Sequence, residues 1–422
     1  MKLLLINTSD KGGAGKACAR LHMGLLNMDI DSKLLLAKKT SNYNESYVLH
    51  PKKNNTLLDK LQRKTLKILR ELKLLSVPKK TQEELFVEKR TKGLELYSFP
   101  NTKYDITESE LYKQADIINL HWVSGFLDYQ SFFQKNTKPV VWTLHDMNPF
   151  SGGEHYEETF LGINKKGLPT KRTFSNEELA QFESVLNLKK EALSKVKDLH
   201  FVTLCDWMTN EIKQKEVFNR FPIHKIPNGI DSSIFKIRNK VHSRDLLNIP
   251  LDKKVILFVA DLIGANRKGF NILVEAIEKL EQHNVQLFVI GNRNDSLSHL
   301  KNIIQYGTVN DDRLLSSIYS AADVFVIPSL MDNLPNTVLE SLLCGTPVIG
   351  FPIGGIPDMI LHKKNGIIAE DVSVEALANA IFKFLNEDVT YSAEEIRKDA
   401  VSKYDEKVQA KKYIELFESL VN

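Results

Sequence analysis

Short apolar runs alternate with amphipathic stretches along the chain. The first run, Leu3–Asn7, is followed by glycines and by a helical pattern that extends to about Met28, and Ser32–Ala37 is the next run. Short apolar runs bounded by turn residues are typical of strands buried in parallel sheets. Three more runs predict strands in the first half of the chain: Asp116–Leu120, Val140–Leu144 and Leu199–Leu204.

The pattern restarts after the turn-rich segment Ile226–Asp231. Strands separated by helices imply an α/β chain with doubly wound parallel sheets, and two such series predict two Rossmann-like domains with a ligand site in their shared cleft. The second series comprises strands at Val255–Val259, Gln286–Ile290, Val324–Ile327 and Val348–Gly350, and helices at Phe270–Gln282, Asp312–Ala321, Pro335–Cys344 and Asp405–Leu420.

Composition narrows the class of protein. A chain of 422 residues is long enough for two or three domains, and its net charge of +4 is too small to indicate nucleic-acid binding. The three cysteines, Cys18, Cys205 and Cys344, lack a metal-binding spacing and fit reduced thiols. No apolar run approaches the roughly 20 residues that span a bilayer, and MKLLLINTSD fits a first strand better than a signal peptide. We therefore expect a cytoplasmic protein.

Two carboxylates stand out in the second half. Asp332 lies in a predicted loop and Glu340 inside the following predicted helix. Pro335 suits a first helical turn, and Asn333 and Asn336 are predicted to cap it. The start of a helix favours a phosphate, and a carboxylate such as Glu340 can accept hydrogen bonds from the cis-diol of a ribose. The alternative is that Glu340 only pairs locally on a solvated helix.

These residues resemble the retaining GT-B glycosyltransferases of group 1, family 4, which include glycogen synthases and bacterial mannosyltransferases. The signature of that group is Glu, seven residues, Glu, and then GTPVV, and this chain reads D-NLPNTVL-E followed by CGTPVIG. GGAG near the start, TLHDMNPFSGGEHY, PNGID and RKGF extend the resemblance over nearly the whole chain. Within the group, the chain is most similar to bacterial enzymes that build surface polysaccharides.

The resemblance implies a GT-B fold in three parts. Residues 1–226 form an acceptor domain, residues 227–403 a donor domain, and residues 404–422 a helix that packs back on the first domain. It also implies an activity: transfer of a sugar, with retention, from a UDP-sugar or GDP-sugar to a glycan or lipid-linked glycan. No cofactor and no metal are expected.

The resemblance assigns catalytic roles to four residues. Glu340 binds the ribose hydroxyls and Lys268 the diphosphate. His145, at a strand end, contacts the transferred sugar across the cleft. Asp332 stands in the place of the first Glu, near the sugar's hydroxyls, with a side chain one methylene shorter.

Further residues complete the implied donor site. Relatives carry an Arg where this chain has Asp261, and Arg267 is expected to compensate. The loop with Gly13 and Gly15 approaches the donor phosphate. The segment Asn333, Leu334, Pro335, Asn336 and Thr337 lies beside the sugar and diphosphate, and Lys16, Glu154 and His155 are predicted on the acceptor side.

Two short motifs favour other interpretations. Lys11–Ala17 resembles the phosphate loop of partition-type ATPases, but Ala17 stands where the Mg²⁺-binding hydroxyl is needed. A nucleotide-dependent ATPase or switch therefore remains an alternative function, as does a non-catalytic sugar-nucleotide binder, given the departures at 332 and 261. The acids of Asp29–Asp31 match a metal-binding pair of another glycosyltransferase fold, but a solvated turn is the simpler explanation.

Residues 52–80 form a basic segment, with ten Lys or Arg and two acids. Its leucines fall at helical spacing, so the segment fits either peripheral contact with an anionic membrane, on the inner face of the plasma membrane, or an amphipathic helix packed on the first domain. Both remain open. No aromatic residue occurs from Leu57 to Glu84, which argues against nucleic-acid binding.

Overall fold

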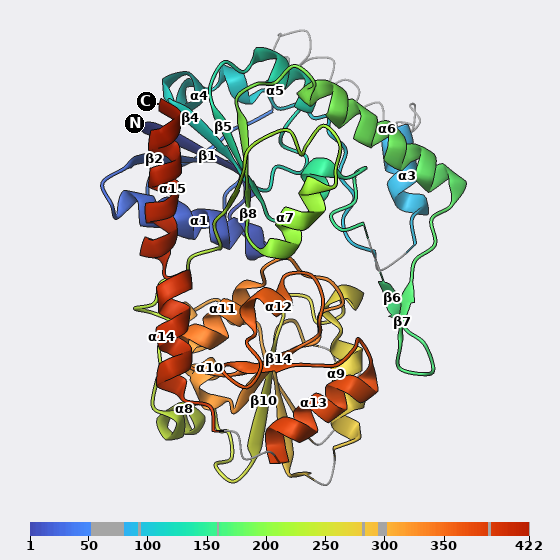
Figure 1. Cartoon of the computed structure of the whole chain (residues 1–422), viewed down its shortest axis with the longest axis vertical. Helices are drawn as coiled ribbons and strands as arrows, with labels where there is room; N and C mark the ends of the chain where they lie inside the picture. The colour runs from blue at the N-terminus through green and yellow to red at the C-terminus, as the bar shows by residue number, and fades with distance from the viewer. Residues whose placement is uncertain are drawn as a thin grey trace, which may run out of the picture.

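The computed structural model describes residues 1–51, 80–91, 94–157, 160–280, 283–293, 302–386 and 390–421. Two α/β domains lie one above the other (Figure 1). The upper, N-terminal sheet is parallel and seven-stranded, in the order β3-β2-β1-β4-β5-β8-β9. Its strands are β1 (Lys2–Ser9), β2 (Asp31–Lys38), β3 (Ser46–Val48), β4 (Ile117–Leu120), β5 (Val140–Leu144), β8 (Leu199–Thr203) and β9 (Ile223–Lys225).

The lower, C-terminal sheet is also parallel, in the order β12-β11-β10-β13-β14-β15. Both sheets place the carboxyl ends of their central strands toward the other domain, where ligands of such sheets bind. Its strands are β10 (Lys254–Val259), β11 (Val285–Ile290), β12 (Ile303–Gly307), β13 (Val324–Ile327), β14 (Val348–Gly350) and β15 (Gly366–Ile368).

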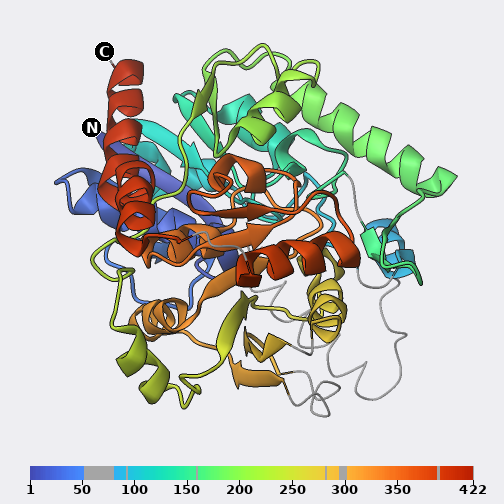
Figure 2. The ribbon, with the colours of Figure 1, turned by 60° about the horizontal axis from the view of Figure 1, so that its bottom comes forward.

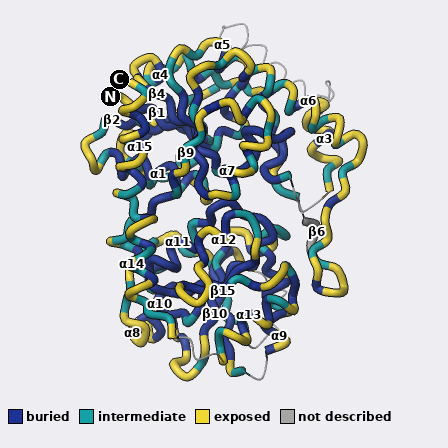
Figure 3. The backbone as a smooth tube through the Cα atoms, in the orientation of Figure 1, coloured by how far each residue is buried: buried dark blue, intermediate teal, exposed yellow. Residues whose placement is uncertain are grey.

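Helices cover the sheets, and the central strands are buried (Figure 3). The N-terminal domain contains α1 (Gly12–Leu26), α3 (Gln82–Lys89), α4 (Glu110–Gln114), α5 (Tyr129–Lys135), α6 (Asn176–Leu193) and α7 (Asp206–Lys213), with 3-10 turns η1 (Ile106–Glu108) and η2 (Asn148–Phe150). The remaining helices are α8 (Lys240–Leu246), α9 (Phe270–Glu278), α10 (Asp312–Ala321), α11 (Asn336–Leu343), α12 (Ile356–Met359), α13 (Val374–Asn386), α14 (Ala393–Tyr404) and α15 (Glu406–Val421), with the 3-10 turn η3 (Asn266–Lys268).

The C-terminal end of the chain crosses back to the first domain, as predicted. Tyr413 and Phe417 of α15 are fully buried in a cluster with residues of β1, β2 and α1. The hydroxyl of Tyr413 also lies 2.8 Å from Oγ1 of Thr143 in β5. As a result the two termini lie together at one side of the molecule (Figures 1 and 2).

Both crossings between the domains occur at the same place. The N–H of Ile230, in the first crossing, donates to the carbonyl of Tyr404 at 2.8 Å, and the N–H of Glu406 donates back to Ile230 at 3.1 Å. A separate hairpin, β6 (Phe160–Ile163) with β7 (Pro169–Lys171), reaches the C-terminal domain, where the carbonyl of Gly167 accepts from the N–H of Val374 at 3.1 Å. The exact residue limits of the three predicted parts stay a prediction.

No helix within the described ranges is long and apolar enough to cross a membrane. The basic segment falls almost wholly outside the described residues, at 52–79. The prediction of peripheral membrane contact therefore stays a prediction.

Candidate active site between the two domains

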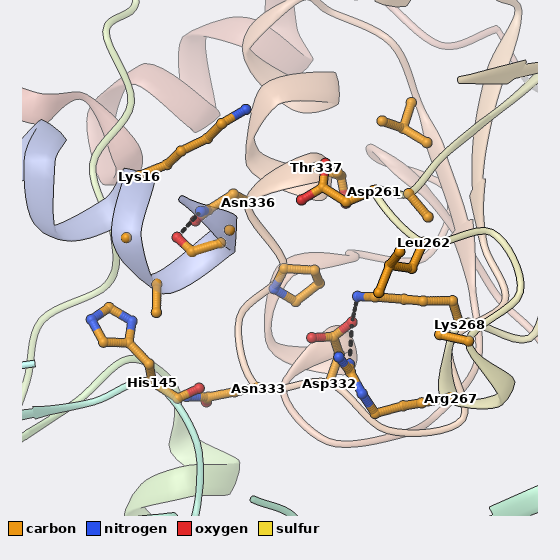
Figure 4. Close-up of a pocket in the computed structure, with 18 of the residues that line it drawn as sticks. Lys16, His145, Asp261, Leu262, Arg267, Lys268, Asp332, Asn333, Asn336 and Thr337 are labelled. Atoms are coloured by element: carbon orange, nitrogen blue, oxygen red, sulfur yellow. Dashed lines mark hydrogen bonds and ion pairs between the residues drawn. The ribbon is translucent and has the colours of Figure 1, made fainter. Parts of the chain in front are cut away.

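A cavity of about 470 Å³ opens between the two sheets (Figure 4). The N-terminal wall is the loop before α1 together with the residues that follow β5, and the C-terminal wall is η3, the loop after β13 and the start of α11. The predicted site residues that line it are Gly13, Gly15, Lys16, His145, His155, Arg267, Lys268, Asp332, Asn333, Leu334, Pro335, Asn336, Thr337 and Glu340, and Asp261 lies on its rim.

The glycine loop that opens α1 forms a tight junction with β1. At Gly15, an added Cβ would lie 2.5 Å from the carbonyl oxygen of Ser9, so only glycine lets the helix approach the strand this closely. The carbonyl of Gly13 accepts a hydrogen bond from Nδ2 of Asn336 in the other domain, at 3.1 Å. The loop thus forms part of the interdomain contact as well as the cavity wall.

Lys268 and Arg267, both half-buried, form an ion cluster with the buried Asp332 (Figure 4). Oδ2 of Asp332 lies 2.7 Å from Nζ of Lys268 and 3.3 Å from Nη1 of Arg267. Burial raises the pKa of the Asp332 carboxyl, but the two cations outweigh burial and hold that pKa below its usual value. Arg267 also bonds Glu95 of the N-terminal domain at 2.8 Å and lies over the ring of Tyr156. Asp332 is therefore the anion that pairs with both of the cations predicted to bind the diphosphate, Lys268 and Arg267.

Glu340 is buried, and its cationic partner, Arg20, lies far away in the sequence. Its Oε1 accepts from Nη1 and Nη2 of Arg20 at 3.1 and 3.0 Å, and its Oε2 accepts from the hydroxyl of Tyr319 at 3.1 Å. Only 5% of the residue is exposed, and burial raises the pKa of its carboxyl while Arg20 opposes that shift. Local pairing on a solvated helix face is therefore ruled out.

The predicted capping of this helix is wrong. Pro335 occupies the N-cap of α11, with no side-chain hydrogen bond to the first turn. Asn333 instead donates to the carbonyls of Leu144 and His145 at 2.9 and 3.1 Å, and Asn336 accepts from Asn228 at 2.9 Å. Both amides therefore bridge the two domains, where they find backbone and amide partners. The N–H groups in the first turn of α11 have no side-chain cap and lie at the cavity.

His145 is the first member of a buried chain of hydrogen bonds. Its Nε2 lies 2.9 Å from Nδ1 of His121, whose Nε2 lies 2.9 Å from Oδ1 of Asn119. Nδ2 of Asn119 donates to the carbonyl of Val141 at 3.0 Å, which fixes the orientation of the amide. His121 must then donate from Nε2 to Asn119 and accept at Nδ1, so His145 carries its proton on Nε2 and its Nδ1 is a hydrogen-bond acceptor.

The C-terminal wall of this site matches a known family. The model of Glycosyl transferases group 1 matches residues 253–387. MJ1607, an uncharacterized glycosyltransferase of Methanocaldococcus jannaschii, is 27% identical over 330 residues, which are 71% of this chain and 84% of that protein. TuaC of Bacillus subtilis, named as a teichuronic acid biosynthesis glycosyltransferase, is 31% identical over 166 residues, but these are only 39% of this chain and 42% of TuaC.

Two solved structures share the whole fold. Sucrose-phosphate synthase from Thermosynechococcus elongatus has a TM-score of 0.68 at 18% identity, covering 100% of this chain and 99% of its own. Anabaena HepE, in complex with UDP and glucose, has a TM-score of 0.65 at 15% identity, covering 100% of both chains. Residues 253–387 therefore match Glycosyl transferases group 1, and the whole chain has the GT-B fold.

Of the three residues predicted on the acceptor side, one lies away from the cavity. Glu154 does not line the cavity. Its carboxylate is 1% exposed and lies 2.6 Å from Nη2 of Arg90 and 2.8 Å from Nη1 of Arg172, so it is the core of a buried ion cluster. His155 does face the cavity, with Nδ1 held by Asp146 at 2.6 Å.

The structure does not support the alternative function, an ATPase or switch that uses Lys11–Ala17 as a phosphate loop. Ala17, where such a loop needs a hydroxyl, is 2% exposed and packs inside the N-terminal domain. Asp29 lies in the turn after α1, with a left-handed φ of 59°, as the solvated-turn interpretation predicts. In the part of the chain that the structure describes, no group of three His, Cys, Asp or Glu residues is arranged to hold a metal ion.

Sequence reasoning missed the partners of the predicted residues. Arg20, Tyr319 and Glu95 all contact them directly, from segments that no motif covers. The one local signal is Arg20 itself, a charged residue within the small and apolar run ACARL of α1.

The hydrogen-bond chain predicts a neutral His145 protonated on Nε2. Burial lowers its pKa to about 4, so the ring stays neutral at and below neutral pH. Two-bond ¹H–¹⁵N correlation spectra of ¹⁵N-labelled protein, assigned with a His145→Asn variant, test this between about pH 8 and pH 6. The protein unfolded in urea, whose histidines titrate near pH 6.5, is the reference. A doubly protonated ring at about pH 6, or a proton on Nδ1, contradicts the assignment.

Proposed function

We propose that this glycosyltransferase moves a sugar, with retention, from a nucleoside-diphosphate sugar to a glycan or lipid-linked glycan. One observation carries the proposal: a single interdomain cavity holds a buried carboxylate, two adjacent cations and an uncapped helix start. A ribose diol, a diphosphate and a sugar are the three parts of a ligand that needs such groups together.

In this proposal the bound donor replaces some of the contacts that the side chains of the cavity make with one another. Glu340 accepts the ribose hydroxyls, and the diphosphate takes Lys268, Arg267 and the first-turn N–H groups of α11. Asp332 holds both cations in the absence of donor, so an incoming phosphate competes with this carboxylate. The shared fold with HepE, whose structure contains UDP and glucose, supports this placement of the nucleotide.

The transfer step follows from the same charges. The acceptor oxygen bonds to the anomeric carbon on the face from which the diphosphate leaves, and the acceptor proton passes to the departing phosphate oxygen. Lys268 and the helix N–H groups stabilise the charge that develops there. Nδ1 of His145 accepts a hydrogen bond from a hydroxyl of the transferred sugar, and His145 thereby holds that sugar across the cleft.

For the acceptor we propose a surface glycan. TuaC, whose name places it in teichuronic acid biosynthesis, supports this class, although it aligns over less than half of either chain. Lys16 and His155, at the N-terminal side of the cavity, are the residues we assign to acceptor contact.

We propose that the reaction needs no metal ion, because Lys268, Arg267 and the start of α11 already supply positive charge at the diphosphate position. Turnover of the donor should therefore be unchanged by excess EDTA. Loss of activity that is restored by Mg²⁺ or Mn²⁺ would show that a metal carries this charge instead.

Replacing Glu340 tests the donor site. Glu340→Gln keeps the size of the side chain but removes the charge, and a hydrogen bond to a charged group is worth about 1.5–3 kcal/mol, so the Kd for UDP or GDP should rise about 10- to 100-fold. Isothermal titration calorimetry measures the Kd, and Glu418→Gln, on the exposed face of α15, is the matched control. Melting curves verify that both variants fold. An unchanged Kd for Glu340→Gln contradicts the proposal.

A further inference from the structure

Arg20 reaches from one domain into the site of the other. It lies on α1, and its guanidinium donates two hydrogen bonds to Oε1 of Glu340 and one, at 3.2 Å, to Oδ2 of Asp312. Its Cζ lies 5.5 Å from the centre of the Phe235 ring, and its side chain is 12% exposed. The guanidinium is therefore held by contacts on its face and along its edge, which leaves it little freedom.

Glu340 depends on this contact to stay charged. A buried carboxylate is stable as an anion only beside a positive partner, and Arg20 is the cation that bonds it in the described part of the chain. The charged and titratable groups that face Glu340 are Arg20 and Lys16 from α1, Asp312 and Tyr319 from α10, and Cys344 at the end of α11. Arg397 from α14 instead bonds the carbonyl of Leu343 near the end of α11.

The same contacts leave room for a ligand. A carboxylate offers about four acceptor positions. Arg20 takes two on Oε1, and Tyr319 takes one on Oε2. The remaining position is on Oε2, in a residue that lines the cavity. Arg20 and Tyr319 thus fix the direction in which Glu340 can accept a hydroxyl.

We propose that Arg20 is a positioning residue for the donor, which holds the Glu340 carboxylate charged and oriented for ribose from the opposite domain. The proposal rests on the proposed function. Because α1 and α11 belong to different domains, the contact exists only while the cleft is closed as described. Closure of the two domains and ribose binding are therefore coupled through one guanidinium.

Calorimetric titration of Arg20 variants with UDP and GDP tests this role. At neutral pH, Arg20→Ala should weaken nucleotide binding about tenfold, because a ribose hydrogen bond to an uncharged or misoriented Glu340 lacks the roughly 1.5 kcal/mol that a charged acceptor supplies. The ratio of the variant Kd to the wild-type Kd should fall as the pH is raised, because higher pH ionises Glu340 again. Arg20→Lys, which keeps the charge, should recover most of the affinity, and Arg313→Ala, an exposed neighbour on α10, should change nothing.

Each outcome of these Kd measurements supports or contradicts the role of Arg20. A Kd ratio that is near one, or that does not change with pH, overturns the role of Arg20. If melting curves show that Arg20→Ala is unfolded, Arg20→Gln, which keeps N–H donors without charge, should give the same pH-dependent ratio. Wild-type protein that binds neither nucleotide overturns the proposed function together with this inference, whereas wild-type binding that Arg20→Ala and Arg20→Gln match overturns the inference alone.

Discussion

A buried charge needs an opposite charge beside it, and Glu340, a buried carboxylate of the site, finds its cation across the domain boundary. Glu340 of the C-terminal domain pairs with Arg20 of the N-terminal domain, and Arg267 pairs with Glu95. Removing one partner leaves the other uncompensated in a medium that solvates it poorly. The ion pairs that cross the cleft therefore contribute to holding the two domains in this arrangement.

The backbone supports the same arrangement. The chain crosses between the domains at Ile230 and again at Tyr404–Glu406, and the two crossings are hydrogen-bonded to each other. The hairpin β6–β7 adds a further contact between the domains, at Gly167 and Val374. Asn333 and Asn336 add neutral bridges beside the cavity itself. Together these contacts hold the two walls of the cavity in place.

The central strands could be predicted from the sequence because their side chains are apolar on both faces. The bounds of β5, β13 and β14 match the predicted ones, as do those of α10. The edge strand β3 escaped prediction because two of its three residues are exposed and the strand carries no run of apolar side chains. The start of α6 is marked by a capping box at Ser175 and Glu178, a signal that hydrophobic periodicity does not contain.

The site was predicted in part for a related reason. Residues such as Lys268 and Glu340 each lie in a short local motif, and the fold brings these motifs to one cavity. Their partners are set by tertiary contacts between positions hundreds of residues apart, which no local pattern encodes. The shift of Asn333 and Asn336 from helix caps to interdomain bridges has the same origin, because a cap can be inferred from neighbours and a bridge cannot.

The most direct test of the account is proton NMR of the purified protein incubated with individual UDP-sugars and GDP-sugars, read before the released sugar mutarotates. The account predicts that one donor is consumed without ATP, and that the sugar first appears with the anomeric configuration of that donor. An inverted anomer, or hydrolysis of ATP with no nucleotide sugar consumed, would contradict it.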